Sequence, residues 1–522
     1  MLLAVYLNTK RSLKNFRELY REEFFVDKSE IISKINKKIF TKSKYVCITR
    51  PRRFGKTSIV DMLGAYYTKD IDCKGIFDTL NISKSESYLE NLNKNNVINI
   101  SFNKIPDKGN TYEDYINMVK DSLIEDITEK FTGIDPNKYF TISDMLESTD
   151  EDFIFIIDEW DYIFSHNLFK ENHQDFLEFI RNLLKDRSYV ALCYMTGVLP
   201  IKKYSTGSSL NMFDEYTFLK DKVFDEYFGF TESETKELCE RQNKVSFEEI
   251  SEWYNGYSTH EGIKIFNPRS VNKALNMGYC ESYWTNTGSM DEVKHHLKYN
   301  ILEIRDDVIK MLDGESVRII IKEEFRAGQK APSTKKEIFS AMIILGFLSY
   351  SDGYLKIPNK EIMIEFENAL SDDCFGYVAD IIKNSERMLK ATINEDADIV
   401  TSILHDIHNS EIPILQYNDE NSLSCVVTLA YLAARDIYRI EREEKTGKGY
   451  ADFTFHPRKK GDIPIILELK KDDSVDHAIE QIKDKEYFRK FVKENKSVLA
   501  VAICYDSKNK NHNCKFEKII FE

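Results

Sequence analysis

A short apolar segment at residues 45–49 runs directly into a loop that ends in Gly55, Lys56 and Thr57, and a helical pattern begins near Ser58. Glycine, lysine and a hydroxyl residue between a strand and a helix match the end of a phosphate-binding loop. In such a loop the backbone N–H groups and the start of the following helix cradle phosphates. This junction therefore favours an α/β fold for the N-terminal part of the chain.

Three further apolar segments in the first 230 residues have the length of strands, and helical stretches separate them. They lie at residues 97–102, 153–157 and 189–195. Strands that alternate with helices predict a parallel sheet. Polar residues with a predicted chemical role follow these strands.

The loop residues have separate predicted roles in binding ATP. Lys56 is expected to reach the β- and γ-phosphates, and the Thr57 hydroxyl is expected to bind Mg²⁺. Gly55 and Ser58, where the loop meets the helix, belong to the same nucleotide-binding set.

Arginines take unusual places in this loop. Arg50 stands where the first glycine of a phosphate-binding loop is usually found, and this departure leaves nucleotide affinity and turnover open. Arg52 and Arg53 are also assigned to nucleotide binding. They can supply within this chain the positive charge that many P-loop ATPases receive from a neighbouring molecule. Self-association of the protein stays an open alternative.

Two acids follow the segment at residues 153–157. Asp158 is expected to bind the Mg²⁺ of the nucleotide through water, and Glu159 to orient and deprotonate the hydrolytic water. Thr196, after the last of the four apolar segments, is expected to lie between the two motifs and to contact the γ-phosphate. Each pattern arises by chance, but their order at strand ends favours a nucleotide site.

A second set of charged residues lies near the C-terminus. Asp452 follows a glycine-containing stretch at residues 447–451, and Glu468 and Lys470 interrupt an apolar segment. We expect two strands, with Asp452 at the end of the first and the other two residues on one face of the second. Two carboxylates that hold Mg²⁺ or Mn²⁺, beside a lysine that stabilises developing charge, suit phosphodiester hydrolysis.

Such residues are also common at solvated strand ends, so a domain that binds without cutting remains an alternative. Charge inside an apolar strand is costly unless it has a task or a partner, which favours an active site. The net charge of −14 argues against indiscriminate coating of nucleic acid. Basic residues at 458–460 and 470–471 either form a local basic surface beside the predicted site or are a solvated hairpin turn and strand end, and charge alone leaves both readings open.

Composition limits the class of protein. The chain has 522 residues, of which 42% are hydrophobic and 31% charged. This length predicts about three domains, and this composition is typical of a soluble globular protein. Nine cysteines without a C-x-x-C pair favour reduced thiols over a zinc site or a disulfide framework. Because the positive charges follow the apolar residues 1–7 and no segment reaches membrane-spanning length, we expect a cytoplasmic protein with no membrane partner.

With its motifs in this order, the chain resembles bacterial AAA-ATPase-like proteins that carry a C-terminal PD-(D/E)XK nuclease-like domain. The resemblance spans nearly the whole sequence, and this family typically has the arginine-rich loop in place of the first glycine. The matching motifs are Phe25-Val26-Asp27-Lys28, the loop from Arg50 to Thr57, Asp158-Glu159-Trp160-Asp161, Thr196-Gly197-Val198, Phe228-Gly229-Phe230-Thr231, Trp253-Tyr254-Asn255-Gly256-Tyr257 and Phe266-Asn267-Pro268.

The resemblance implies an α/β fold class with four parts. These are a P-loop NTPase (AAA-like) core over residues 1–230, a helical lid over 231–300, a small winged-helix-like connector over 301–385 and a restriction-endonuclease-like domain over 386–522. A predicted helix at residues 338–347, followed by a hairpin that turns at Asp352 and Gly353, supports the connector. Thr231 and Glu234 resemble a capping box that opens the lid.

The resemblance also adds residues to the nuclease site. Glu420 opens an apolar helix that is expected to run to about residue 438, and it is implied as an acid that joins the site from outside the sheet. A later helix, at residues 478–487, carries Gln481 and Lys485. These two residues are four apart, share one face, and are expected to contact the substrate phosphate.

Together these expectations predict an ATP-binding, nucleotide-regulated, Mg²⁺-dependent nuclease that acts on DNA, with a role in defence against foreign genetic elements. Two alternatives stay open. One is an ATPase switch whose C-terminal domain binds nucleic acid or a protein partner without cleaving, and the other is an RNA-directed nuclease.

Overall fold

The computed structural model describes residues 4–106, 111–201, 210–284, 304–312, 314–329, 332, 334–370, 377–409, 420–459, 461–492 and 495–521. It divides into two compact units. The first consists of Met1–Asn286, Ile319–Gly353 and Pro358–Glu361, and the second of Thr287–Arg318, Tyr354–Ile357 and Ile362–Glu522. Each unit contains its own five-stranded sheet. The four-part division expected above stays a prediction.

The sheet of the first unit has the strand order β2-β3-β4-β1-β5, and every neighbouring pair in it is parallel. The four predicted strands are present, and the predicted parallel sheet is confirmed. A short fifth strand that the sequence did not indicate lies at one edge. The strands are β1 (Tyr45–Thr49), β2 (Asn96–Ser101), β3 (Phe153–Asp158), β4 (Val190–Gly197) and β5 (Asp214–Tyr216).

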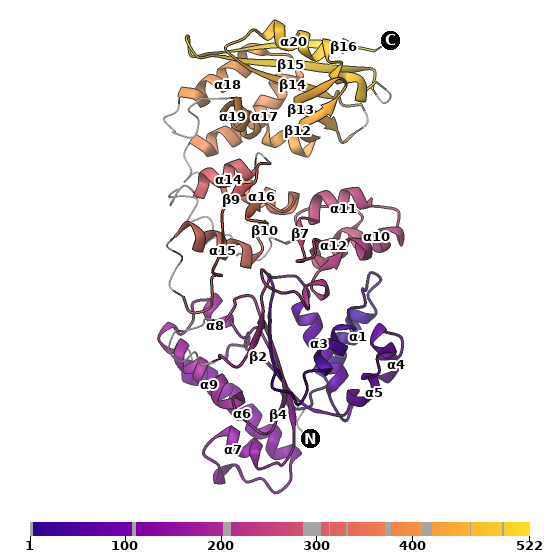
Figure 1. Cartoon of the computed structure of the whole chain (residues 1–522), viewed down its shortest axis with the longest axis vertical. Helices are drawn as coiled ribbons and strands as arrows, with labels where there is room; N and C mark the ends of the chain where they lie inside the picture. The colour runs from indigo at the N-terminus through magenta and orange to yellow at the C-terminus, as the bar shows by residue number, and fades with distance from the viewer. Residues whose placement is uncertain are drawn as a thin grey trace. The chain divides into compact units, whose positions relative to one another are not determined.

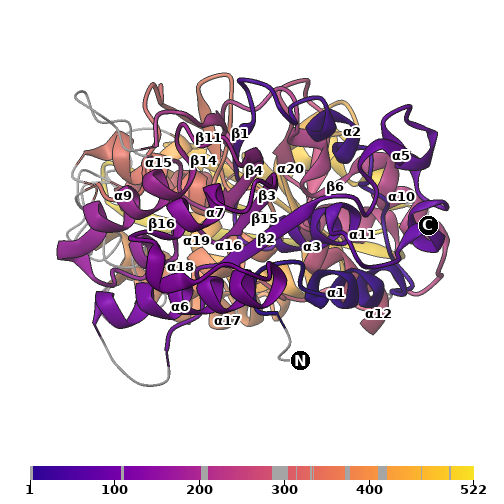
Figure 2. The same cartoon turned by 90° about the horizontal axis from the view of Figure 1, so that it is seen from below.

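Helices cover both faces of this sheet. Figures 1 and 2 show α1 and α3 on one side of it and α6 and α9 on the other. Alternate residues of β1 enter different cores, since Val46 and Ile48 pack on the α1 and α3 side while Cys47 packs on the opposite side. The helices up to the end of β4 are α1 (Arg11–Tyr20), α2 (Ile31–Asn36), α3 (Lys56–Tyr67), α4 (Lys74–Phe77), α5 (Tyr88–Asn91), α6 (Tyr112–Lys130), α7 (Ile142–Glu147), α8 (Tyr162–Ser165) and α9 (His173–Leu184).

The predicted helical lid begins with the expected capping box. Thr231 Oγ1 accepts a hydrogen bond from Glu234 N at 3.3 Å, and Glu234 Oε2 accepts one from Thr231 N at 2.7 Å. A small antiparallel sheet of order β6-β8-β7 packs with three helices around a separate apolar core. These elements are β6 (Phe230–Thr231), α10 (Glu232–Glu240), α11 (Phe247–Tyr254), β7 (Tyr257–Ser258), β8 (Lys264–Phe266) and α12 (Pro268–Met277).

The helix predicted at residues 338–347 is present as α15 (Lys335–Leu345), which starts earlier because Thr334 and Glu337 form a capping box. The predicted turn is also present. Asp352 and Gly353 have φ values of 52° and 85°, as a tight hairpin turn requires, and β10 (Ser349–Ser351) and β11 (Tyr354–Lys356) flank them.

The sheet of the second unit is mixed, with the order β12-β13-β14-β15-β16. Only β14 and β15 run parallel, and the other neighbours are antiparallel. Helix α20 and the strands enclose one apolar core. The strands are β12 (Tyr438–Thr446), β13 (Gly449–Pro457), β14 (Ile465–Lys471), β15 (Ser497–Asp506) and β16 (Asn511–Ile520).

Besides α15, the described residues after the predicted lid form further α-helices. They are α14 (Ile304–Leu312), α16 (Lys360–Leu370), α17 (Tyr377–Ile393), α18 (Ala397–Asn409), α19 (Glu420–Ala430) and α20 (Val475–Asp484). None of the helices within the described ranges is both long and apolar enough to cross a membrane.

Two boundary predictions near the C-terminus are wrong. The apolar helix ends at Ala430 instead of near residue 438, because the chain from Tyr438 pairs with β13 as a strand, with Ile440 opposite Phe455. Asp452 is the fourth residue of the nine-residue β13 and does not end that strand. The α/β fold class itself is confirmed by the parallel sheet of the first unit and the mixed sheet of the second.

Candidate functional site

The predicted nucleotide loop lies between β1 and α3. Its turns are made by Arg53 and Gly55, whose φ values are 71° and 85°, and Gly55 is the N-cap of α3. Glycine adopts such a φ at little cost, whereas an arginine is strained there. Lys56 is the first residue of the helix, so the helix N-terminus points at the loop.

Lys56 is buried, with 8% of its surface exposed. Its ammonium donates hydrogen bonds to the carbonyl oxygens of Arg50 and Pro51, each at 2.9 Å. Burial lowers the pKa of Lys56 to about 8, against the opposing charges of Asp161 and Asp158. A buried ammonium with a lowered pKa is suited to bind an anion that restores its charge.

The other predicted loop residues lie around this lysine. Thr57 is exposed at the start of α3, and Ser58, Arg52 and Arg53 are half-buried. The pKa of Arg53 is lowered by burial and by the charges of Arg269 and Arg52, so several guanidinium groups gather at this loop.

Asp158 ends β3 and is 4% exposed. Burial raises its pKa to about 6, and the charge of Glu159 adds to that rise, while a hydrogen bond with the Thr57 side chain opposes it. The structure therefore brings together Thr57 and Asp158, the two residues predicted to hold the Mg²⁺ of the nucleotide. Their oxygen donors are of the kind that Mg²⁺ prefers. Glu159 is half-buried and has a φ of 50°, an uncommon conformation for a glutamate.

Strand β4, which carries Thr196, lies between β1 and β3 as predicted. Thr196 is fully buried, and its hydroxyl donates to the carbonyl of Ile48 at 2.7 Å. This bond ties β4 to β1, and the contact of Thr196 with a γ-phosphate stays a prediction.

Asp161 is a residue whose place in this site was not predicted. It is 2% exposed, and it accepts hydrogen bonds from Val198 N at 3.1 Å and Leu199 N at 2.8 Å. A side chain at Gly197 would collide with it, because a Cβ there would lie 2.2 Å from Asp161 Oδ1. Asp161 thus fixes the chain after β4 beside Lys56. Its position in the Asp158-Glu159-Trp160-Asp161 motif was the available signal.

The predicted nuclease residues come together on β13 and β14. Phe453 pairs with Leu467, which brings the neighbouring Asp452 and Glu468 side by side, and Leu469 N donates to Asp452 Oδ2 at 2.7 Å. Glu468 is 1% exposed. Burial raises its pKa to about 7, and the charge of Asp452 adds to that rise.

The carboxylate of Glu468 has two differently placed oxygens. Oε1 accepts a hydrogen bond from Lys470 Nζ at 3.0 Å and another from Gln481 Nε2. Oε2 is buried and has no hydrogen-bond partner among the described residues. An unpartnered buried carboxylate oxygen beside a second acid fits a divalent cation, because hard cations take oxygen ligands.

Gln481 and Tyr487 border this group from α20 and the turn after it. Gln481 Nε2 also lies 3.2 Å from the hydroxyl of Tyr487, which is 2% exposed. Tyr487 in turn lies against Gly449, where a Cβ would approach its hydroxyl to 3.1 Å. Because Gly449 has no side chain, Tyr487 can approach β13, the strand that carries Asp452. Tyr487 was not among the predicted site residues.

Lys485 and Glu420 differ from the rest of the predicted set. Lys485 is exposed and is the C-cap of α20, where its carbonyl accepts a hydrogen bond from Lys448 N at 2.7 Å. Glu420 is the first residue of α19, but its side chain lies outside the described part of the structure. The phosphate contact of Lys485 and the metal ligation by Glu420 stay predictions.

A further group of ligand-type side chains lies on β12 and β13. Ligand atoms of Glu441, Glu444 and His456 lie within 4.8 Å of one another. Glu444 Oε2 is 2.7 Å from His456 Nε2, and the ammonium of Lys490 pairs with the same carboxylate. A cation of the protein therefore already balances this group.

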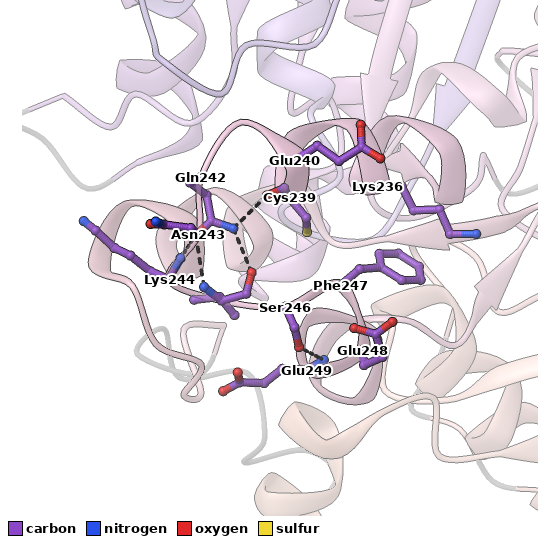
Figure 3. A pocket seen from close by; sticks show the side chains of 11 residues that line it. Lys236, Cys239, Glu240, Gln242, Asn243, Lys244, Ser246, Phe247, Glu248 and Glu249 are labelled. Carbon is purple, nitrogen blue, oxygen red and sulfur yellow. Dashed lines mark hydrogen bonds between the residues drawn. The ribbon is translucent and has the colours of Figure 1, made fainter.

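A shallow pocket of about 620 Å³ lies between α10 and α11 (Figure 3). Its lining includes Gln242, which holds the connecting loop through hydrogen bonds to the carbonyls of Cys239 at 3.0 Å and Val245 at 2.7 Å. Its walls mix acidic, basic and apolar side chains, and none of them belongs to the predicted nucleotide or carboxylate motifs. We assign no function to this pocket.

Comparisons with known proteins match the two parts of the chain that contain these groups of residues. Residues 11–206 match the model of a predicted AAA-ATPase, and residues 418–515 match the PD-(D/E)XK nuclease superfamily. The comparison with curated proteins finds no significant match.

Two solved structures are only slightly similar. One is a Walker-type ATPase of Pyrococcus abyssi, at 14% identity and a TM-score of 0.35, covering 66% of this chain and 99% of the other. The second is the Aeropyrum pernix ORC2 protein, solved as ADPNP–ADP complexes, at 11% identity and a TM-score of 0.32, covering 68% of this chain and 97% of the other. The assignment accordingly depends on the two domain models: this chain joins an N-terminal predicted AAA-ATPase domain to a C-terminal domain of the PD-(D/E)XK nuclease superfamily.

Proposed function

We propose that this protein is a Mg²⁺-dependent nuclease that cuts DNA under the control of ATP. The matches to the AAA-ATPase and PD-(D/E)XK nuclease families support an ATP-binding nuclease in general terms. The observation that carries the finer proposal is the group formed by Asp452, Glu468, Lys470 and Gln481, in which one buried carboxylate oxygen has no hydrogen-bond partner within the part of the chain that the structure describes.

Each residue of this group has a defined task. Asp452 and Glu468 would hold one or two Mg²⁺ or Mn²⁺ ions, which when bound supply an activated water and neutralise charge on the phosphate. Lys470, 3.0 Å from Glu468, brings a positive charge to the place where the attacking water and the transition-state charge would lie. Gln481 fixes the orientation of Glu468 through Oε1.

The nucleotide site would act through Lys56 on the phosphates and through Thr57 and Asp158 on their Mg²⁺. Glu159 would orient and deprotonate the hydrolytic water, and Arg52 and Arg53 would contribute positive charge. Because both sites belong to one chain, we propose that ATP binding or hydrolysis changes the rate of cleavage. We further propose that the protein acts in the cytoplasm in defence against foreign genetic elements. Self-association of the chain is also part of the proposal.

The test is incubation of the purified full-length protein with plasmid DNA and with RNA of matched length, in Mg²⁺ or Mn²⁺. We expect DNA to be cut by the wild type and not by Asp452→Ala or Glu468→Ala. Glu441→Gln is the matched control, since it removes an acid from the same sheet without touching the predicted metal ligands.

Cleavage that survives both alanine substitutions would contradict the assignment of the site. Cleavage of RNA alone would replace the proposed substrate with RNA. If neither substrate were cut under any condition while the wild type still bound nucleic acid, the C-terminal domain would be a binding module instead of a nuclease.

A further inference from the structure

Arg50, which takes the place of the first loop glycine, is one of the most buried charged residues of the protein. It is 2% exposed, and its guanidinium stacks on Phe228 with 4.8 Å between the guanidinium carbon and the ring centroid. Nη1 donates to the carbonyls of Thr49 at 2.8 Å and Tyr216 at 3.0 Å. Nη2 forms an ion pair with Asp221. Both terminal nitrogens of the guanidinium therefore have partners inside the protein.

Asp221 is equally buried, with 1% of its side chain exposed. One of its oxygens pairs with Arg50, and the other accepts hydrogen bonds from Val223 N at 2.7 Å and Phe224 N at 2.9 Å. Both oxygens thus have partners, as a buried carboxylate requires. The ion pair joins the start of the nucleotide loop to a segment about 170 residues later in the chain.

The main chain of Arg50 connects the ion pair to Lys56 and to β4. Its carbonyl accepts a hydrogen bond from the ammonium of Lys56, and its N–H donates to Gly197 at 3.1 Å. Phe54, further along the loop, packs against Phe218 and Tyr257, with ring centroids 5.8 Å and 5.1 Å apart. Side chains at both ends of the loop are therefore anchored outside it.

We propose that Arg50 and Asp221 are positioning residues of the nucleotide site. In this chain the buried side chain of Arg50 fixes the backbone at the start of the loop. Other phosphate-binding loops have a glycine at this position. The anchored carbonyl of Arg50 then holds Lys56 where the phosphates bind. This inference rests on the proposed binding of ATP and extends it to two residues that touch no part of the nucleotide.

The test compares the affinity of the full-length protein for a fluorescent ATP analogue with its thermal stability. Arg50→Ala and Asp221→Asn are each expected to weaken binding by about tenfold to a hundredfold, because a displaced loop misplaces Lys56. The double variant is expected to lose little more than either single one, since both break the same link. Arg50→Lys keeps the charge but not the planar guanidinium, so an intermediate loss of affinity is expected. This variant replaces Arg50→Ala in the test if Arg50→Ala does not fold.

The control is a second ion pair of similar type, whose carboxylate, Glu215, lies on β5. Arg326 pairs with Glu215 at 2.9 Å, and 16% and 7% of the two side chains are exposed. Arg326→Ala is expected to lower the melting temperature without a comparable loss of affinity.

Three outcomes would overturn the inference. The ion pair of Arg50 and Asp221 does not position the loop if Arg50→Ala binds the ATP analogue with unchanged affinity. The same conclusion holds if Arg50→Ala does not fold and both single variants, Arg50→Lys and Asp221→Asn, bind with unchanged affinity. Equal losses of affinity in Arg326→Ala, at a matched loss of stability, would reduce the effect to general destabilisation. A wild-type protein that binds no nucleotide would overturn the proposed function and this inference with it.

Discussion

The nucleotide loop and the carboxylate site use opposite charges in the same structural setting. Each lies on a five-stranded sheet and contains a buried charge whose pKa is shifted toward the neutral form. In the loop that charge is Lys56, whose pKa is lowered to about 8, and in the second unit it is Glu468, whose pKa is raised to about 7. A buried cation selects an anion and a buried carboxylate selects a cation. The sign of this shifted charge is therefore one difference between the predicted phosphate site and the predicted metal site.

The two lysines sharpen this difference. Lys56 is held by backbone carbonyls, whereas Lys470 lies directly on a carboxylate. Neutral carbonyls leave Lys56 its charge for a phosphate, while Lys470 shares its charge with a predicted metal ligand. We therefore expect Lys56 to control affinity and Lys470 to control the rate of a chemical step.

Among variants that keep both predicted metal ligands, the largest effect is expected at Lys470. Replacing it with Met should lower the rate of DNA cleavage by about 10²–10³-fold, because a charge aimed at the transition state is lost. Binding of Mn²⁺, measured by calorimetry, should remain. A loss of metal binding as large as the loss of rate would instead make Lys470 a structural partner of Glu468.

Glu468→Gln should change stability in a pH-dependent way. The pKa of Glu468 is raised from 4.5 to about 7, so the folded protein binds an extra proton between these values. The stability that this proton contributes is complete below about pH 4.5 and is lost as pH rises through 7. Without metal, Glu468→Gln should therefore be more stable than the wild type at pH 8, by on the order of 3 kcal/mol.

Thermal unfolding in EDTA checks this expectation. The difference between Glu468→Gln and the wild type should shrink toward zero near pH 5. Glu441→Gln is the control, and an identical pH dependence in both variants would contradict the burial argument.

Gln481 and Lys485 are expected to differ, although both were predicted to contact phosphate. Gln481→Ala should lower the cleavage rate by about 10–100-fold, since it releases the oriented oxygen of Glu468. Lys485→Ala should weaken DNA binding by less than about 1 kcal/mol, because its side chain is exposed. Steady-state kinetics would separate the two effects. Equal losses of cleavage rate in both variants would instead support a phosphate contact shared by Gln481 and Lys485.

A pH dependence of nucleotide affinity is expected as well. Since the pKa of Lys56 is lowered to about 8, the ammonium loses its proton above that pH in the free protein. Affinity for an ATP analogue should then fall by up to about tenfold for each pH unit above 8. Titration between pH 7 and 9 measures this, and a flat profile would mean that Lys56 keeps its charge.

Local patterns predicted the parts of both sites that are close in sequence. The apolar strand before Asp158 and the short connection between β13 and β14 allowed the acids to be placed, and the structure brings Asp452 and Glu468 together. Contacts between distant segments could not be foreseen. Nothing near Arg50 in the sequence indicates Asp221 as its partner, so the loop appeared only to lack a glycine.

Two predicted phosphate contacts stay predictions, and the structure adds the neighbours of the residues concerned. The spacing of Gln481 and Lys485 predicted one shared face. Lys485 is the C-cap of α20, and its N–H donates to the carbonyl of Gln481 at 3.0 Å, so the two residues still lie one helical turn apart. Thr196 was predicted from its place at a strand end, and this place is correct, but its hydroxyl bonds to the neighbouring strand. Sequence period gives the direction of a side chain and does not give the neighbours that it meets.

The most direct test of the account is cleavage of plasmid DNA by the full-length protein in Mg²⁺, measured with and without ATP. The wild type is expected to cut at clearly different rates in the two conditions, and Asp452→Ala is expected not to cut in either. In Lys56→Ala, ATP is expected to have no effect on the rate. A wild type whose rate is the same with and without ATP, and equal to that of Lys56→Ala, would contradict control of the nuclease by the nucleotide.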